Sequence, residues 1–142
     1  MNIRKLQESD IPFATHIVAQ NYSEKDGELS YREMEAMYKN HTMNPFYYVV
    51  EHKKEIIGIW WYSQSWMDYD TYEIFWINIA PLYQRQWIGS MLVQHIIKKI
   101  KEDPDATSIL LKTHSPEFYS KNFGFQIIRN INDSSKLMIL SL

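Results

Sequence analysis

Residues 74–101 constrain the fold most, because they read as a buried strand, a polar turn and an amphipathic helix in direct succession. Aromatic and β-branched residues dominate residues 72–79, as they do in strands, and Pro81 ends the run because proline has no N–H to donate to a sheet. From about residue 87 to residue 101, apolar side chains recur at helical spacing. They are Ile88, Leu92, Val93, Ile96, Ile97 and Ile100. The sequence therefore predicts a strand–turn–helix unit at the centre of the fold.

The turn in this unit, residues 83–89, is the chemical feature of the chain. The first N–H groups of a helix have no partner within the helix, so a strand that leads into a helix start offers donors to an anion such as phosphate. Arg85 adds a positive charge. The alternative is a structural turn with a polar tip, because any strand–turn–helix unit has this geometry.

Composition limits the classes of protein to which the chain can belong. Its 142 residues suit one domain, residues 1–142. The absence of cysteine excludes disulfides and thiolate chemistry, and the net charge of −2 argues against general nucleic-acid binding. The N-terminus has no signal-peptide pattern and no apolar run is long enough to span a membrane, so we expect a cytoplasmic protein. The five histidines show no paired ligand spacing, which predicts no metal site; they are His16, His41, His52, His95 and His114.

The N-terminal part reads as a strand followed by two helices. Residues 2–6 form the strand, and residues 11–21 form a helix. This helix is expected to bury Phe13, Ile17 and Val18. After a polar loop, Ser30 caps a second helix with Glu33 three residues later, and residues 44–45 end it. Acidic residues prevail between residues 21 and 40, which fits a solvated helix face or an acidic mouth that attracts a cationic amine.

A hairpin precedes the central strand. Its strands cover residues 46–51 and 56–66, and a charged turn at residues 52–55 joins them, with Gly58 at a bulge. Alternation puts Trp60, Tyr62 and Trp66 on one face and Trp61 on the other. These aromatic side chains either fill the core or form a wall for an apolar or cationic substrate.

The C-terminal part supplies the remaining strands. Residues 108–113 form a buried strand, parallel to the central one because a helix connects them. Ser115 caps a short helix that ends at Gly124, and residues 125–129 and 136–140 pair as a hairpin. The element order is β-α-α-β-β-β-α-β-α-β-β. We therefore predict an α/β (α+β) fold, a mixed twisted sheet with helices on both faces.

The central turn resembles a family motif. Pro81-x-Tyr83-Gln84-x-x-Trp87-Ile88-Gly89-x-x-Leu92 is similar to the acetyl-coenzyme A motif Gln/Arg-x-x-Gly-x-Gly/Ala of the GNAT N-acetyltransferases. Gln84 and Gly89 match, and Trp87 stands where the family usually has its first glycine. The element order and the ending at residues 118–125 are also similar to those of the family.

This resemblance implies an acetyl-coenzyme A-dependent N-acetyltransferase, which moves an acetyl group to a primary amine of a small molecule, peptide or protein by direct attack in a ternary complex. It implies that backbone groups of Ile77, Asn78 and Ile79 hold the acetyl and pantetheine part. Those of Gln84, Arg85, Gln86, Trp87, Ile88, Gly89 and Ser90 would hold the pyrophosphate, with charge from Arg85 or Lys121. The cofactor is expected to enter where the central strand and residues 108–113 part.

The resemblance also indicates candidate catalytic residues. Glu73 is the candidate base, and if Ile79 faces the cofactor, a residue six positions earlier shares its face. Tyr119 is the candidate acid for the leaving sulfur, with His114 as a possible proton relay. The alternatives are a solvent-facing Glu73 and a core-packed Tyr119.

Trp87 leaves the function open in one respect. Its side chain either blocks the cofactor or lies flat beside it with the backbone still accessible. Two alternatives to the enzyme follow: a non-catalytic sensor that binds acyl-coenzyme A, and an interaction protein whose site Trp87 fills. An aromatic-rich chain with a C-terminal hairpin is also compatible with a homodimer.

Overall fold

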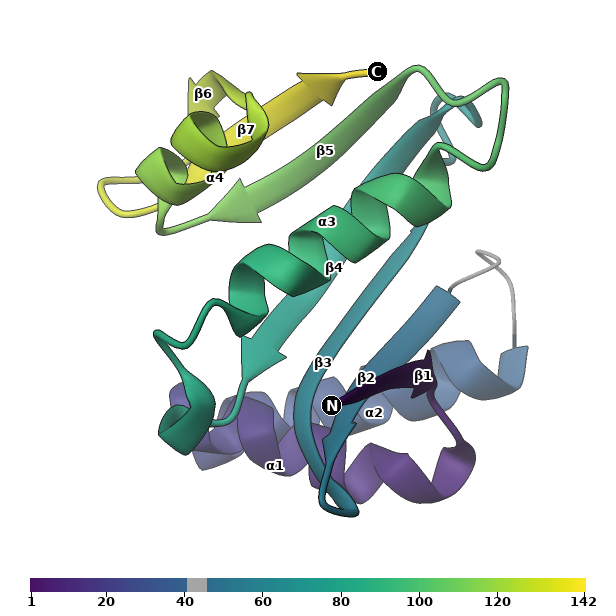
Figure 1. Ribbon diagram of the computed structural model, residues 1–142, viewed down its shortest axis with the longest axis vertical. Helices are drawn as coiled ribbons and strands as arrows, with labels where there is room; N and C mark the ends of the chain where they lie inside the picture. The colour runs from purple at the N-terminus through teal and green to yellow at the C-terminus, as the bar shows by residue number, and fades with distance from the viewer. Residues whose placement is uncertain (41–45) are drawn as a thin grey trace.

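The computed structural model describes residues 1–40 and 46–142. In the described residues, seven strands form one sheet in the order β1-β2-β3-β4-β5-β7-β6 (Figure 1). The strands are β1 (Asn2–Lys5), β2 (Phe46–His52), β3 (Glu55–Gln64), β4 (Thr71–Ile79), β5 (Ser108–Thr113), β6 (Gln126–Asn130) and β7 (Lys136–Ser141). The helices are α1 (Ile11–Asn21), α2 (Glu24–Asn40), α3 (Ile88–Ile100) and α4 (Pro116–Phe123), with short 3-10 turns at Glu8–Asp10 and Pro81–Tyr83. This is the predicted order and fold class.

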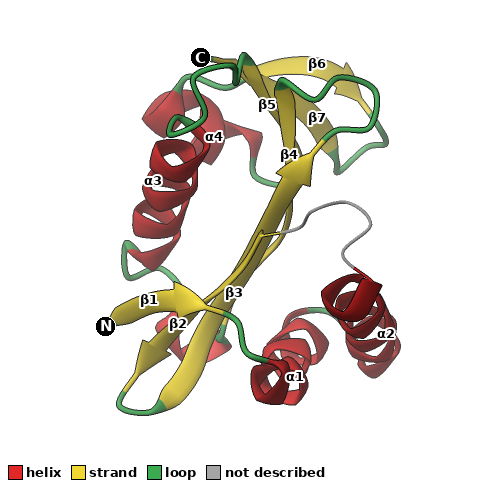
Figure 2. Ribbon diagram, turned by 90° about the vertical axis from the view of Figure 1, so that its right-hand side faces the viewer, coloured by secondary structure: helices red, strands yellow, loops and turns green. Residues whose placement is uncertain are grey.

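Helices cover both faces of the sheet, as predicted (Figure 2). α1 and α2 pack on one face, where Trp61 joins a buried cluster with Val18 and Met34. α3 and α4 pack on the other face, where Trp60 and Tyr62 are buried with the apolar side of α3. The apolar side chains that recur at helical spacing thus form the buried face of α3. Trp60 and Trp61 point to opposite faces of the sheet, as expected.

β4 and β5 run parallel and are joined through α3, as the spacing predicted. They pair over three residues only, and the last pair joins Glu73 to Leu110. Beyond Glu73 the two strands part, so the rest of β4 has no β5 partner. This opening positions the site described below.

The start of α2 was predicted wrongly. α2 begins at Glu24, and its cap is Ser23, whose hydroxyl oxygen accepts the N–H of Asp26 at 3.1 Å. Ser30 lies inside the helix, where its hydroxyl donates to the Gly27 carbonyl at 2.8 Å. The predicted end at residues 44–45 and the side chain of His41 lie outside the described residues.

Two aromatic side chains are exposed, although the sequence predicted burial for Phe13 and offered core packing as one of two interpretations for Trp66. Phe13 is 63% exposed, because the buried face of α1 is centred on Ala14 and Val18 and Phe13 lies on the other side of the helix. Trp66 lies beyond the end of β3 and is also exposed, so the alternation of that strand no longer governs its direction. The remaining tryptophans of β3 fill the core, as one of the two interpretations held.

Candidate active site

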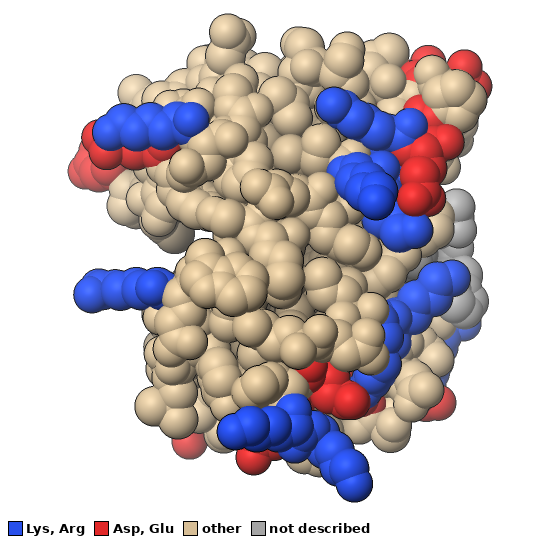
Figure 3. Space-filling model, viewed as in Figure 1, with Lys and Arg blue, Asp and Glu red and all other residues tan. Residues whose placement is uncertain are grey.

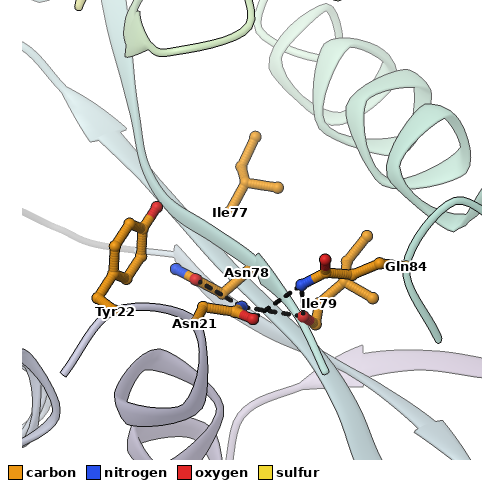
Figure 4. Close-up of a pocket in the computed structure, with 6 residues that line it drawn as sticks. All are labelled: Asn21, Tyr22, Ile77, Asn78, Ile79 and Gln84. Atoms are coloured by element: carbon orange, nitrogen blue, oxygen red, sulfur yellow. Dashed lines mark hydrogen bonds between the residues drawn. The ribbon is translucent and has the colours of Figure 1, made fainter. Parts of the chain in front are cut away.

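A hollow of about 350 Å³ lies at the end of β4. Its lining residues are Asn21, Tyr22, Ile77, Asn78, Ile79 and Gln84 (Figure 4). The space-filling view shows the margin of the molecule hollowed between the part that carries α4 and the turn ahead of α3 (Figure 3). Lys and Arg side chains project on both sides of this indentation. The opening between β4 and β5 is therefore accessible from the surface.

The turn that leads into α3 adopts an unusual backbone conformation. Arg85 and Trp87 have φ angles of 61° and 58°, in the left-handed region that favours glycine. Trp87 is the N-cap of α3, and its carbonyl accepts the N–H of Met91 at 3.1 Å. The N–H groups of the first turn of α3 therefore have no acceptor within the helix.

The side chain of Trp87 is 66% exposed. The indole does not pack into the core at the start of α3. The indole therefore lies on the surface of the turn that leads into α3.

Gly89 brings three elements together at the start of α3. A Cβ atom at this position would lie 3.6 Å from Cδ1 of Ile79 and 3.7 Å from Cζ of Phe118. The first turn of α3, the end of β4 and α4 therefore converge at one point. The predicted cofactor-binding residues, which the sequence divides between residues 77–79 and 84–90, are adjacent in space.

A bulge in β4 corrects the predicted orientation of Glu73. Ile59 pairs with Asn78 while Trp61 pairs with Phe75, so two steps along β3 match three steps along β4. The extra residue reverses the alternation beyond it. Ile77 and Ile79 contact the cluster under α3, whereas Glu73 shares the α1–α2 face with Phe75 and Asn78. The prediction that Glu73 and Ile79 share a face was wrong, because parity counting assumes a regular strand.

Glu73 lies where β4 and β5 part. It is half-buried, with Ser63 opposite on β3 and Leu110 opposite on β5. Burial raises the pKa of its carboxyl above the ordinary value, and a hydrogen bond from Ser65 partly opposes that shift. A carboxylate with a raised pKa at the apex of an opening has the character of a general base.

Tyr119 lies on the opposite face, in α4. It is 8% exposed and packs edge-on against Phe118 and Phe125, with ring centroids 5.0 and 5.7 Å away. Burial, and to a lesser extent the hydroxyl of Tyr22, raises its pKa to about 12. Tyr119 therefore keeps its proton at neutral pH, and its ring packs in the hydrophobic core.

Side-chain amides close the far end of β4. Gln84 donates to the carbonyl of Ile79 at 2.9 Å and to Oδ1 of Asn21 at 2.7 Å. Asn21 donates to the same carbonyl at 2.9 Å and to Oδ1 of Asn78 at 3.1 Å (Figure 4). Sequence reasoning missed Asn21 and Tyr22, because Asn21 was expected only as the end of the first helix and Tyr22 only as part of the polar loop after it. The overlooked signal was Ser23-x-x-Asp26, which marks a helix start and brings the end of α1 close to β4.

The remaining candidates lie at the margins of the opening. Lys121 of α4 is exposed and lies 3.7 Å from a carboxylate oxygen of Glu117. Arg85 is exposed on the turn. Nδ1 of His114 lies 3.0 Å from the carbonyl oxygen of Ser134, so the turn between β6 and β7 holds the imidazole. Among the described residues, no helix has the length and apolar character needed to cross a membrane.

Comparison with known proteins identifies a family. The sequence model of the acetyltransferase (GNAT) family matches residues 11–125. No curated protein matches the chain.

Solved structures with low sequence identity share the fold. An aminoglycoside 6'-N-acetyltransferase complexed with coenzyme A superposes with a TM-score of 0.82 at 15% identity, covering 99% of this chain and 97% of that chain. The PaiA N-acetyltransferase from Thermoplasma acidophilum, in complex with coenzyme A, has a TM-score of 0.73 at 21% identity, with 99% and 98% covered. A spermidine N-acetyltransferase chimera of Vibrio cholerae SpeG and hSSAT has a TM-score of 0.72 at 21% identity, with 99% and 96% covered.

Proposed function

The chain belongs to the acetyltransferase (GNAT) family, and from this premise we propose that residues 1–142 act as one domain that transfers an acetyl group from acetyl-coenzyme A to a primary amine. The observation that carries the proposal is the parting of β4 and β5 after Glu73 beside the start of α3. An unpaired strand edge offers backbone groups to an extended thioester arm, and a helix start offers N–H groups to a pyrophosphate.

The residues at the opening fit acetyl-coenzyme A. The edge of β4 at Ile77, Asn78 and Ile79 would bind the pantetheine arm through the backbone. The turn from Gln84 to Ser90 would bind the pyrophosphate, and we expect the exposed indole of Trp87 to lie beside it. Two of the similar solved structures contain coenzyme A, which supports this co-substrate.

Glu73 would act as the base. The carboxylate of Glu73 lies on the α1–α2 face of the sheet, so an amine that enters from that side would meet it there. The thioester would lie on the α3 side of the opening. The neutral amine attacks the thioester carbonyl carbon, a C–N bond forms, the C–S bond breaks, and the amine proton passes to Glu73 directly or through water. The raised pKa of Glu73 brings it closer to the operating pH than an ordinary glutamate.

Tyr119 would assist the leaving sulfur. A tyrosine whose pKa is about 12 stays protonated, so it donates a hydrogen bond to the developing thiolate. The acceptor class is an amine of a small molecule, peptide or protein. Two of the similar solved structures are named as aminoglycoside and spermidine acetyltransferases, so polyamines and aminoglycosides are the first acceptors to test.

The first experiment measures the shift of the unfolding midpoint on adding acetyl-coenzyme A to the wild type and to Trp87→Gly. A ligand at about a hundredfold its dissociation constant adds roughly 2.7 kcal/mol. For a domain of this size, that raises the midpoint on the order of 10 °C. We expect this rise in both proteins. A rise in Trp87→Gly alone would mean that the indole fills the site, and no rise in either would contradict the proposal.

A second step separates an enzyme from a sensor. Release of free thiol is measured with a panel of amines, with Glu73→Gln as the comparison. Turnover with at least one amine is expected, and tight binding without turnover for any amine would favour an acyl-coenzyme A sensor.

A further inference from the structure

We propose that Asn21 and Gln84 are positioning residues, which hold the predicted pyrophosphate turn against the end of β4 so that one ligand can reach both. We name this pair the amide clamp. The inference rests on the proposed function, because it concerns the same opening. The clamp joins the end of α1 to the turn ahead of α3, two segments that are 63 residues apart in the sequence.

The amides in the clamp have a single consistent orientation. A backbone carbonyl can only accept, so both side chains must turn their NH₂ groups toward the Ile79 oxygen, each at 2.9 Å. The Asn21 oxygen then accepts from Gln84 at 2.7 Å, and the second N–H of Asn21 reaches Asn78 at 3.1 Å. All four amide N–H groups of the two side chains are used, which is why the arrangement resists rotation of either amide.

The clamp lies where the site needs rigidity. Ile79 is the last residue of β4, and Gln84 is the first residue of the turn after the 3-10 helix Pro81–Tyr83. The Gln84 side chain therefore reaches back past the 3-10 helix and joins the start of the turn to the end of the strand. Asn78 is buried beside the clamp, so the hydrogen bond that Asn21 donates to it anchors the Asn21 side chain to the sheet (Figure 4).

A positioning role differs from a merely structural one in its effect on two probes. In the proposed binding mode, pantetheine would contact the strand edge only, whereas coenzyme A would span the strand edge and the turn. If the clamp sets the distance between the strand edge and the turn, its loss weakens the binding of coenzyme A, while the affinity for pantetheine stays nearly the same. A contact that only stabilises the fold would lower the unfolding midpoint and leave the ratio of the two affinities unchanged.

The test measures the dissociation constants of coenzyme A and pantetheine by calorimetry for the wild type, Asn21→Ala, Gln84→Ala and the double variant. Gln20→Ala is the matched control, because Gln20 is the exposed neighbour of Asn21 on the same helix. Each single variant should lower the affinity ratio of coenzyme A to pantetheine by about tenfold, the scale of one or two lost hydrogen bonds. The double variant should lose no more than either single one, since both act through the Ile79 carbonyl.

Two results would overturn the proposal. An unchanged affinity ratio in both single variants would do so, as would losses that simply add in the double variant. A wild type that binds neither probe would overturn the proposed function and the clamp with it. Because Gln84 is exposed, Gln84→Ala is expected to fold, and its unfolding midpoint provides the check.

Discussion

Glu73 combines a negative charge with a half-buried position, and the two conflict. Burial raises the pKa of its carboxyl above 4.5 in the folded chain. The folded chain therefore holds the proton more tightly than the unfolded chain does. Glu73 favours the folded state at low pH, and this contribution is lost as the pH rises from the unfolded pKa through the raised folded pKa. At neutral pH the ionised, half-buried side chain therefore lowers the free energy of unfolding.

This conflict predicts opposite effects of Glu73→Gln on activity and on stability. Without a base, kcat should fall roughly 100-fold or more. The unfolding midpoint at pH 7 should stay the same or rise, because a neutral amide replaces a half-buried charge. The acid limb of the kcat profile should have its midpoint above pH 4.5 in the wild type and disappear in the variant. Exposed Glu55→Gln is the control, and a fall of both kcat and midpoint in Glu73→Gln would assign the residue to the fold alone.

At the scale of elements, the contact between α1 and α2 depends on the absence of a side chain at Gly27. A Cβ atom there would lie 2.6 Å from Cβ of Ala19. Glycine is a poor helix former, by about 1 kcal/mol relative to alanine, so its position inside α2 has to serve packing. Gly27 lets the two helices approach closely, which in turn brings the end of α1 to β4.

Gly27→Ala should therefore lower the free energy of unfolding by about 1–3 kcal/mol, the scale of an overpacked contact, although helix propensity alone predicts a gain. Combining it with Ala19→Gly should recover most of the loss, because the added methyl group regains its space. Gly89→Ala is the comparison, since its Cβ would meet its neighbours at ordinary distances of 3.6 and 3.7 Å. Urea unfolding compares the wild type with these three variants, and a stabilising Gly27→Ala would contradict the close approach.

The same elements show what the sequence can predict. Strands and helices with strong periodicity, such as β4 and α3, lie within a residue or two of their predicted bounds. The start of α2 was predicted wrongly because Asp26-Gly27 is a sequence typical of a turn. Only the contact of Gly27 with α1 explains a glycine inside the helix. The face of the sheet on which Glu73 lies was predicted wrongly because one extra residue in β4 reverses the alternation, and no local sequence signal marks that bulge. Both errors concern contacts between elements, which residue patterns do not contain.

At the scale of the whole molecule, the sheet consists of two parts joined by a short seam. β4 and β5 share three residue pairs, whereas β3 and β4 pair along most of their length. The insertion of β7 between β5 and β6 also depends on tertiary packing, so the sequence predicted the C-terminal hairpin but not its place in the sheet. The candidate site is built on this seam, with residues from α1, β4, the turn and α4. Sequence resemblance identified the strand and turn, and only the fold adds Asn21 and Tyr22.

The position of the seam predicts which residues a bound ligand protects from hydrogen exchange. Acetyl-coenzyme A should slow hydrogen exchange in residues 74–79 and 84–90, because the unpaired edge of β4 and the start of α3 gain partners. At about a hundredfold the dissociation constant, exchange that requires release of the ligand should slow roughly 100-fold. The comparison region is the groove of about 440 Å³ between α1 and α2, which includes His16, Tyr31 and Arg32. Mass spectrometry of peptides with and without the ligand measures both regions. Protection confined to that groove would show that the ligand binds away from the seam, and the parted strands would then have no part in holding it.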